Sequence, residues 1–215
     1  MEQRTKYSAG DFAVIAALVI FYTVGIVGFE LPLTHPLFVK LTPLALILSV
    51  LVLLRYDNGW KNRKFGWFAL FVFAGSYLIE VIGVNTGMIF GAYSYGEGLS
   101  VKLLGTPLMI GLNWILMVYL TSAVVSALRR NFAGQVLLPS VLMVAYDGIM
   151  EQVAHRMDMW QWAGGSIPLQ NYMIWGIMAV AFHSVKYYTA IEIKNKMALP
   201  ILLIQSVFFL LIWII

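Results

Sequence analysis

Long apolar stretches separated by short polar segments dominate the pattern along this chain. Seven of these stretches approach the roughly 20 residues that a helix needs to cross the hydrocarbon core of a bilayer. They lie at residues 11–29, 37–54, 65–84, 105–128, 134–156, 170–190 and 198–215. The second contains Pro43, which neighbouring helices can tolerate inside a membrane. The pattern therefore predicts an all-α fold, a polytopic integral membrane protein with seven transmembrane helices.

Composition places the whole chain in the bilayer as one unit. Of its 215 residues, 61% are hydrophobic and only 11% are charged, whereas soluble domains carry about 25% charged residues. No polar stretch is long enough to form a linker, so residues 1–215 are expected to form a single transmembrane domain. The first stretch lacks a small-residue cleavage signal and is interpreted as a retained helix. The net charge of +4 lies in short loops, which indicates membrane topology rather than nucleic-acid binding.

Lysine and arginine residues predict the orientation in the membrane. Of the 14 in the chain, all but Lys40, Lys102 and Arg156 fall on one side of the predicted spans. Because cytoplasmic loops are enriched in these residues, the N-terminus is expected in the cytoplasm and the C-terminus outside. The residues on the cytoplasmic side are Arg4, Lys6, Arg55, Lys61, Arg63, Lys64, Arg129, Arg130, Lys186, Lys194 and Lys196.

A weak internal repeat relates residues 65–128 to residues 134–190. The segments TPLMIGLNW and IPLQNYMIW share Pro-Leu and have a Trp seven residues after the Pro. Each segment follows a Gly-rich aromatic loop, and each loop follows an outward-running helix that has Glu80 or Glu151 near its end. The two halves are therefore predicted to be parallel repeats about an axis along the membrane normal, with both glutamates facing one central cavity.

Carboxylates inside the predicted spans are the main candidates for chemistry. Each costs about 3 kcal/mol at a helix centre, and the cost falls toward the interface. Asp147, Glu151 and His155 are spaced i, i+4 and i+8, which places them on one stripe of the fifth helix. Glu80 lies near the outer end of the third helix. A structural role in helix packing is the alternative for any one of them.

Polar residues of four helices converge at a similar depth in the outer half of the predicted membrane. Asn113 and Trp114 lie in the outer half of the fourth helix, and Asn171 and Trp175 begin the sixth. The surrounding aromatic rings can stabilise a carbocation through their faces. For most of them, however, an interfacial belt is the favoured interpretation. These aromatic residues are Tyr93, Tyr95, Trp114, Trp160, Trp162 and Trp175.

Such a site suits proton transfer to a weakly basic substrate. Burial disfavours the charged form of a carboxyl group, and a neutral buried acid is a proton donor. A second carboxylate nearby can stabilise a cation or orient water. A metal site is not expected, although His155 with Glu151 and Asp147 leaves a mixed site open. The last span contains no lysine, which disfavours a retinal protein.

Residues 79–175 resemble the membrane carotenoid hydratases, a family often labelled only as carotenoid biosynthesis proteins. The first signature is IEVIGVNTGMIFGAYSYGEGL, followed by GTPLMIGLNWILM. The second is DGIMEQVAHRMDMWQW, followed by IPLQNYMIW, with its W-x-W pair and its Asn-Tyr after Pro-Leu. The chain has Gln152 where the family typically has Pro, and this departure is expected to alter the fifth helix locally.

The resemblance implies that water is added across the terminal 1,2 double bond of an acyclic carotenoid end, of the lycopene or γ-carotene type. It implies no cofactor, with Glu80, Asp147 and Glu151 as the acid/base set. Asn85, Tyr93, Asn113, His155 and Asn171 are secondary candidates for orienting water or the carboxyl groups. The implied partners are a carotenoid substrate, the lipid bilayer and other enzymes of the pathway. The implied location is the cell (inner) membrane, with the site in its outer half.

Three other interpretations remain open from the residues. A carotene cyclase begins with the same protonation but ends in ring closure, and these residues do not distinguish the two outcomes. A proton-coupled transporter needs a path to both faces. The inner halves of the central helices contain no comparable carboxylate cluster, which argues against such a path. A non-catalytic assembly subunit is the third.

Overall fold

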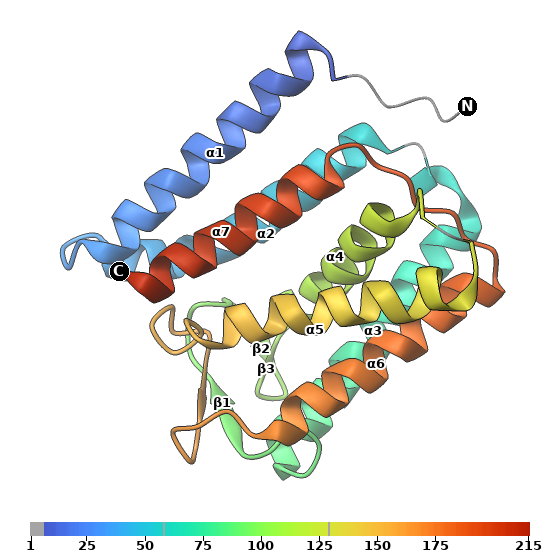
Figure 1. Ribbon diagram of the computed structural model, residues 1–215. Helices are drawn as coiled ribbons and strands as arrows, with labels where there is room; N and C mark the ends of the chain where they lie inside the picture. The colour runs from blue at the N-terminus through green and yellow to red at the C-terminus, as the bar shows by residue number, and fades with distance from the viewer. Residues whose placement is uncertain (1–6, 58, 129) are drawn as a thin grey trace.

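The computed structural model describes residues 7–57, 59–128 and 130–215, and within these ranges the fold is all-α (Figure 1). Arg4, Lys6 and Arg129, which contributed to the predicted orientation, lie outside the described residues. The helices are α1 (Ala9–Glu30), α2 (His35–Tyr56), α3 (Arg63–Thr86), α4 (Leu108–Val125), α5 (Leu138–Glu151), α6 (Leu169–Tyr188) and α7 (Ala198–Ile214). A short 3-10 turn, Gly59–Lys61, precedes α3, and a π-helical turn, Ala133–Leu137, leads into α5.

The prediction of an all-α membrane protein agrees with this fold. Among the described residues, five helical segments are long and apolar enough to cross a membrane. They are Ala9–Glu30, His35–Tyr56, Arg63–Thr86, Leu108–Val125 and Ala133–Glu151. Helix α2 continues through Pro43, as expected for a helix that packs against neighbours. Helix α7 is also apolar but shorter, with 17 residues.

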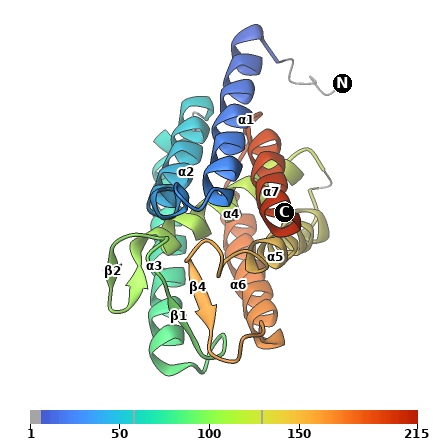
Figure 2. The ribbon, with the colours of Figure 1, turned by 90° about the vertical axis from the view of Figure 1, so that its left-hand side faces the viewer.

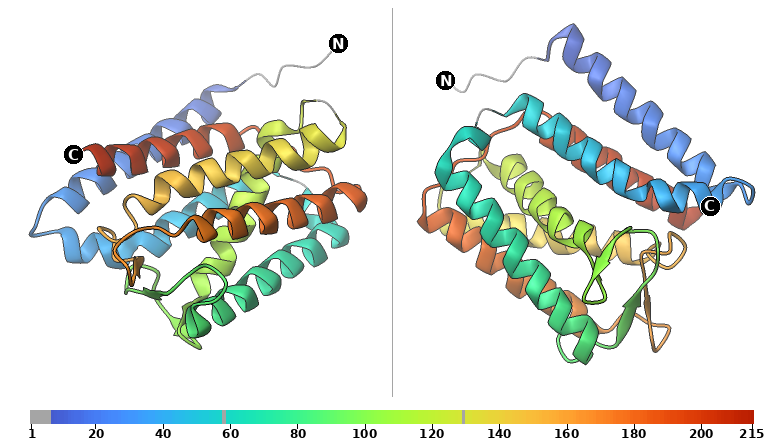
Figure 3. Two further views of the ribbon diagram at one scale, coloured as in Figure 1. Left: turned by 60° about the horizontal axis from the view of Figure 1, so that its bottom comes forward. Right: turned by 180° about the vertical axis from the view of Figure 1, so that it is seen from behind.

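Helix α4 forms the centre of the bundle (Figure 3). It contacts α2, α3, α5, α6 and α7, and it buries Trp114, Met117 and Leu120 completely. In contrast, α1 packs mainly on α2 and α7 and exposes much of its apolar surface. A helix that is apolar on all sides is stable in this position because lipid replaces water around it. The bundle therefore has a buried core around α4 and a lipid-facing rim.

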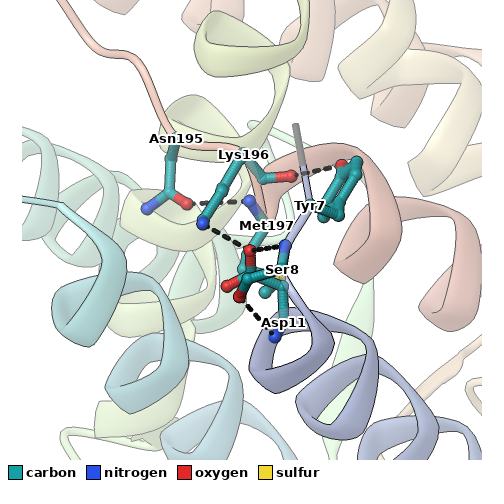
Figure 4. A network of polar contacts seen from close by, with 6 residues as sticks. All are labelled: Tyr7, Ser8, Asp11, Asn195, Lys196 and Met197. Atoms are coloured by element: carbon teal, nitrogen blue, oxygen red, sulfur yellow. Dashed lines mark hydrogen bonds and ion pairs between the residues drawn. The ribbon is translucent and has the colours of Figure 1, made fainter. Parts of the chain in front are cut away.

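Contacts at the two ends of the bundle show how α1, α5, α6 and α7 run relative to one another. At one end, Lys196 of the α6–α7 connection donates to Asp11 at the start of α1 (2.5 Å), and Asp11 also closes a capping box with Ser8 (Figure 4). At the other end, Arg156 donates to Glu30 at the end of α1 (2.8 Å) and to the backbone carbonyl of Ile212 near the end of α7. The second end is called the strand end below, because it also holds all four short strands.

The strands β1 (Tyr93–Tyr95) and β4 (Trp160–Trp162) join the two Gly-rich loops into one antiparallel ribbon (Figure 2). The pairs are Tyr93 with Trp162, Ser94 with Gln161 and Tyr95 with Trp160. Strands β2 (Lys102–Leu103) and β3 (Thr106–Pro107) form a separate hairpin. Helix α4 therefore begins at Leu108 rather than at the predicted residue 105. The sequence pattern predicted the two Gly-rich loops but no strand pairing between them.

The fifth helix is shorter than predicted, and the expected stripe through His155 is wrong. Helix α5 ends at Glu151, and the backbone N–H groups of Gln152 and Val153 donate to carbonyls three residues back. Such bonds tighten a last helical turn and change the direction of the chain. The following segment instead pairs with the β1 loop, where Gly98 N–H donates to the Asp158 carbonyl (2.8 Å). His155 consequently lies exposed outside the helix.

Replacing Gly98 with Val is expected to destabilise the protein by about 1–3 kcal/mol, the usual range for overpacking. A Cβ atom at Gly98 would overlap the Met157 carbonyl oxygen and lie 2.9 Å from that of Asp158, and backbone cannot move aside as a side chain can. Thermal unfolding in detergent measures the effect. Gly164→Ala is the matched control, since no atom lies within 4 Å of its Cβ position. Equal unfolding temperatures for the two variants would contradict the importance of this contact.

Candidate active site

The Glu80 carboxylate, near the end of α3, accepts three hydrogen bonds from aromatic side chains. The hydroxyl groups of Tyr93 and Tyr95 donate to Oε2 at 2.6 and 2.8 Å, and Trp114 Nε1 donates to Oε1 at 3.1 Å. Glu80 is only 4% exposed. A buried carboxylate is tolerated when donors satisfy its oxygens, and here β1 and α4 supply those donors.

Glu151, the last residue of α5, has a matching environment. Trp160 and Trp162 of β4 both donate their indole N–H to Oε2, at 2.9 Å each. Asn171 Nδ2, in the first turn of α6, donates to Oε1 at 2.8 Å. Each of the two glutamates therefore receives two donors from a strand of the ribbon and one from the helix that follows that strand.

The ribbon places four aromatic donors on one face. Because side chains alternate along a strand, Tyr93 and Tyr95 face the bundle together with Trp160 and Trp162, while the residues between them are exposed. Burial, followed by the neighbouring Glu80 carboxylate, raises the pKa of the Tyr95 hydroxyl, and the same two causes raise the pKa of the Tyr93 hydroxyl. Both phenols therefore remain protonated donors.

Asp147 lies one turn before Glu151 on α5 and is fully buried. Asn171 Nδ2, which donates to Glu151, also donates to Asp147 Oδ2 at 3.3 Å, so one amide bridges the two acids. Asp147 Oδ1 has no hydrogen-bond partner among the described residues. An unsatisfied buried carboxyl oxygen is rare in a folded protein and marks a position for a proton or a bound group.

Trp114 and Trp175 stack beside the acids and connect α4 to α6. Their ring centroids are 4.1 Å apart and their planes make an angle of 23°. Both helices begin after a proline cap with nearly identical backbone angles, at Pro107 and Pro168. Since each tryptophan follows its proline by seven residues, the two rings occupy equivalent positions on their helices.

A small cavity of about 20 Å³ lies among these groups. One water molecule needs at least roughly 10–15 Å³ of such volume and two to four polar partners. The cavity has room for one, and Glu80 and Glu151 both contribute oxygens to its wall. Its lining is Glu80, Phe90, Tyr93, Tyr95, Ile110, Glu151, Trp160, Trp162, Asn171 and Trp175.

The structure brings together most of the side chains predicted for the site, but Asn85, Asn113 and His155 are not among them. Asn85 is exposed and donates to the carbonyls of Val81 and Leu104, where it holds the end of α3 to the following loop. His155 is exposed beyond the end of α5, so the mixed metal site with Glu151 and Asp147 is not formed. In the described part of the chain, no three His, Asp or Glu side chains are grouped as metal ligands.

Five of the aromatic residues considered for an interfacial belt use their polar tips as hydrogen-bond donors to the two glutamates. These five are Tyr93, Tyr95, Trp114, Trp160 and Trp162.

Sequence reasoning also missed Ile110 and Phe90, which line the small cavity. The repeat carried a signal for Ile110, because it follows Pro107 by three residues, as Asn171 follows Pro168.

A family model described as carotenoid biosynthesis protein matches residues 37–215, which is most of the chain. No curated protein and no solved structure matches significantly. The matched range contains every residue of the site described above.

Proposed function

Because the chain belongs to the carotenoid biosynthesis protein family, we propose that it is a hydratase that adds water to the terminal 1,2 double bond of an acyclic carotenoid. The observation that carries the proposal is the cavity for one water that Glu80 and Glu151 both line. Asp147, whose Oδ1 is unsatisfied, is linked to Glu151 through the Asn171 amide. Hydration of an alkene needs an acid, a water molecule and a base within one dry site, and these groups supply all three.

The reaction proceeds in two steps, protonation of the double bond and attack of water. A carboxylic acid of the Asp147–Glu151 pair transfers its proton to C2, and the electrons of the double bond form the new C–H bond, which leaves a tertiary cation at C1. The water oxygen then attacks C1, and the proton that it loses returns to a carboxylate of the cluster. The net change is the addition of one water, and no redox cofactor is required.

Asn171 and the aromatic donors hold the acids in position for these steps. One proton shared by Asp147 and Glu151 removes the repulsion between two carboxylates that accept from the same amide. Glu80, which accepts from Tyr93, Tyr95 and Trp114, stabilises the developing positive charge. The ring faces of Trp160 and Trp175, which also line the small cavity, add to that stabilisation.

The proposal includes seven spans in the cell (inner) membrane, with the N-terminus in the cytoplasm. Helices α6 and α7, with 20 and 17 residues, fall within the about 17–25 residues of a transmembrane helix. Their alternation with the other five is supported by the contacts at the two ends of the bundle. The strand end, with the carboxylates, is then the outer half of the membrane.

The proposal also treats residues 65–128 and 134–190 as two parallel repeats within one transmembrane domain. An antiparallel pair of strands has a local two-fold axis. In the observed pairing this axis exchanges β1 with β4. The same operation exchanges Glu80 with Glu151 and Trp114 with Trp175. The hydrogen-bond donors around the two glutamates support this equivalence.

Two alternatives predict different products or properties. A cyclase would use the same acids, but a water site between the glutamates would compete with ring closure, which favours hydration. A proton-coupled transporter needs acids that continue to the opposite end. At that end, Asp11 accepts a hydrogen bond from Lys196, and Asp57 accepts one from Tyr119. Both aspartates lie at helix termini.

Expression in a bacterium that accumulates lycopene tests the function directly. The expected pigment is one water heavier than its precursor, as measured by mass spectrometry of the extracted carotenoids. A cyclic isomer of unchanged mass would identify a cyclase instead. Unchanged lycopene with the protein present in the membrane would contradict both activities on this substrate.

A further inference from the structure

A second, larger cavity of about 230 Å³ opens beside the carboxylates. Its wall is almost entirely apolar and comes from α1, α2, α4, α5 and α7 at the strand end of the bundle. Two residues, Ile110 and Trp160, line both this apolar cavity and the small cavity at the glutamates. The two cavities therefore adjoin at these two side chains, and Trp160 itself donates to Glu151.

The apolar cavity reaches the lipid-facing surface between α1 and α2. Val24 of α1 and Leu41 and Leu44 of α2 line it, and their side chains are 53%, 39% and 48% exposed. An apolar molecule dissolved in the bilayer can enter here without crossing water. At the about 10–15 Å³ of such volume that one water needs, the cavity has room for roughly 15–23 water-sized groups, which corresponds to one part of a long chain.

Polar side chains in the wall show where a hydrogen-bonding group is expected. Tyr22 and Tyr146 are paired with Gln205, at 2.9 and 3.1 Å, so these three need no ligand. Asn113 is different, because it is 5% exposed, lines the cavity and makes no side-chain hydrogen bond within the described ranges. An amide group in the wall of this cavity can donate to and accept from a bound water or hydroxyl group.

We propose that the apolar cavity binds the reacting end of the acyclic carotenoid chain, which enters laterally from the lipid between α1 and α2. This inference rests on the hydration proposed above. The terminal isoprene unit lies against Ile110 and Trp160, so its double bond faces the carboxylates, while the rest of the polyene extends into the bilayer. Asn113 binds the hydroxyl group that forms at that end. The site therefore accepts a linear end and processes one end of the substrate at a time.

Filling the cavity tests this assignment. Ala45 on α2 lines the cavity, and Ala45→Phe adds a ring inside it. Leu51→Phe is the matched control, because Leu51 lies on the same helix, is 56% exposed and does not line the cavity. Lycopene is added to the purified proteins in detergent, and the pigment that remains bound after size-exclusion chromatography is measured by absorbance. Ala45→Phe is expected to retain about tenfold less lycopene than the wild-type protein and the control.

The outcomes separate this inference from the proposed function. Equal lycopene binding by Ala45→Phe and the wild-type protein, or no binding by the wild-type protein, would overturn the cavity assignment. A wild-type protein that binds lycopene in the cavity but forms no alcohol would keep the assignment and overturn hydration. If Ala45→Phe does not accumulate, Ala45→Leu, which adds less volume, takes its place in the same comparison.

Asn113→Leu provides a second readout, because it removes the amide while keeping the side-chain size. Lycopene binding is expected to persist and alcohol formation to fall about tenfold, the effect of one lost hydrogen bond to the hydroxyl group that forms at C1. Unchanged alcohol formation would overturn the role of Asn113.

Discussion

Replacing Glu151 with Gln is expected to lower formation of the carotenoid alcohol by about 100-fold or more, the lower end of what general acid–base catalysis contributes. The amide cannot release a proton to the alkene. Because the two carboxylate oxygens of Glu151 accept from Trp160, Trp162 and Asn171, the NH2 group of the amide would face an N–H donor in either orientation. Asp147→Asn and Glu80→Gln are expected to cause losses of similar size. The measurement is the ratio of alcohol to lycopene in cells with equal amounts of membrane-inserted protein.

The matched control for these variants is Glu97→Gln. This variant makes the same acid-to-amide change at an exposed position, where the Glu97 carboxylate pairs with Lys102 (2.8 Å). It is expected to keep full activity. Undiminished activity in all three cluster variants would exclude these carboxylates as the acid/base set.

Replacing Asn171 with Leu is expected to lower both stability and activity. The Asn171 amide is the single donor that joins Asp147 to Glu151, and without it the two acids lose bonds of 3.3 and 2.8 Å. Leaving buried acceptors unsatisfied costs about 1–3 kcal/mol, and more when they are charged. Thermal unfolding and alcohol formation per folded protein are the two measurements.

Gln170→Leu is the matched control, because Gln170 precedes Asn171 on α6 and its amide donates only to the carbonyls of Met88 and Ile89. We expect it to leave alcohol formation per folded protein unchanged. A loss of activity in Gln170→Leu equal to that in Asn171→Leu would mean that the start of α6, rather than the bridge between the acids, controls the reaction.

Some features of this protein could be predicted from its sequence. Hydropathy predicted the long helices, because the free energy of placing an apolar stretch in a bilayer is nearly a sum over its residues. The spacing from proline to tryptophan predicted that Trp114 and Trp175 are equivalent, since a proline cap fixes where each helix begins. The cost of a carboxylate in a membrane singled out Glu80, Asp147 and Glu151.

Only the tertiary structure decided how the acids are held. Residues 152–159 leave the helical pattern because their backbone groups pair with the distant β1 loop, and this removes His155 from the predicted stripe. Pairing of β1 with β4 joins segments about 65 residues apart, and the local periodicity of the sequence does not predict such a contact. The same pairing turns Tyr93 and Trp162 toward the acids rather than toward a membrane surface.

The sequence by itself therefore determined the kind of protein and the acids that make its chemistry plausible, because both follow from the solvation of individual residues. The tertiary structure decided which donors satisfy those acids, that Asn85 and His155 stand apart from them, and that an apolar cavity adjoins them. Those features depend on how the seven helices within the described ranges and a ribbon pack together, and packing is a property of contacts between segments rather than of any segment alone.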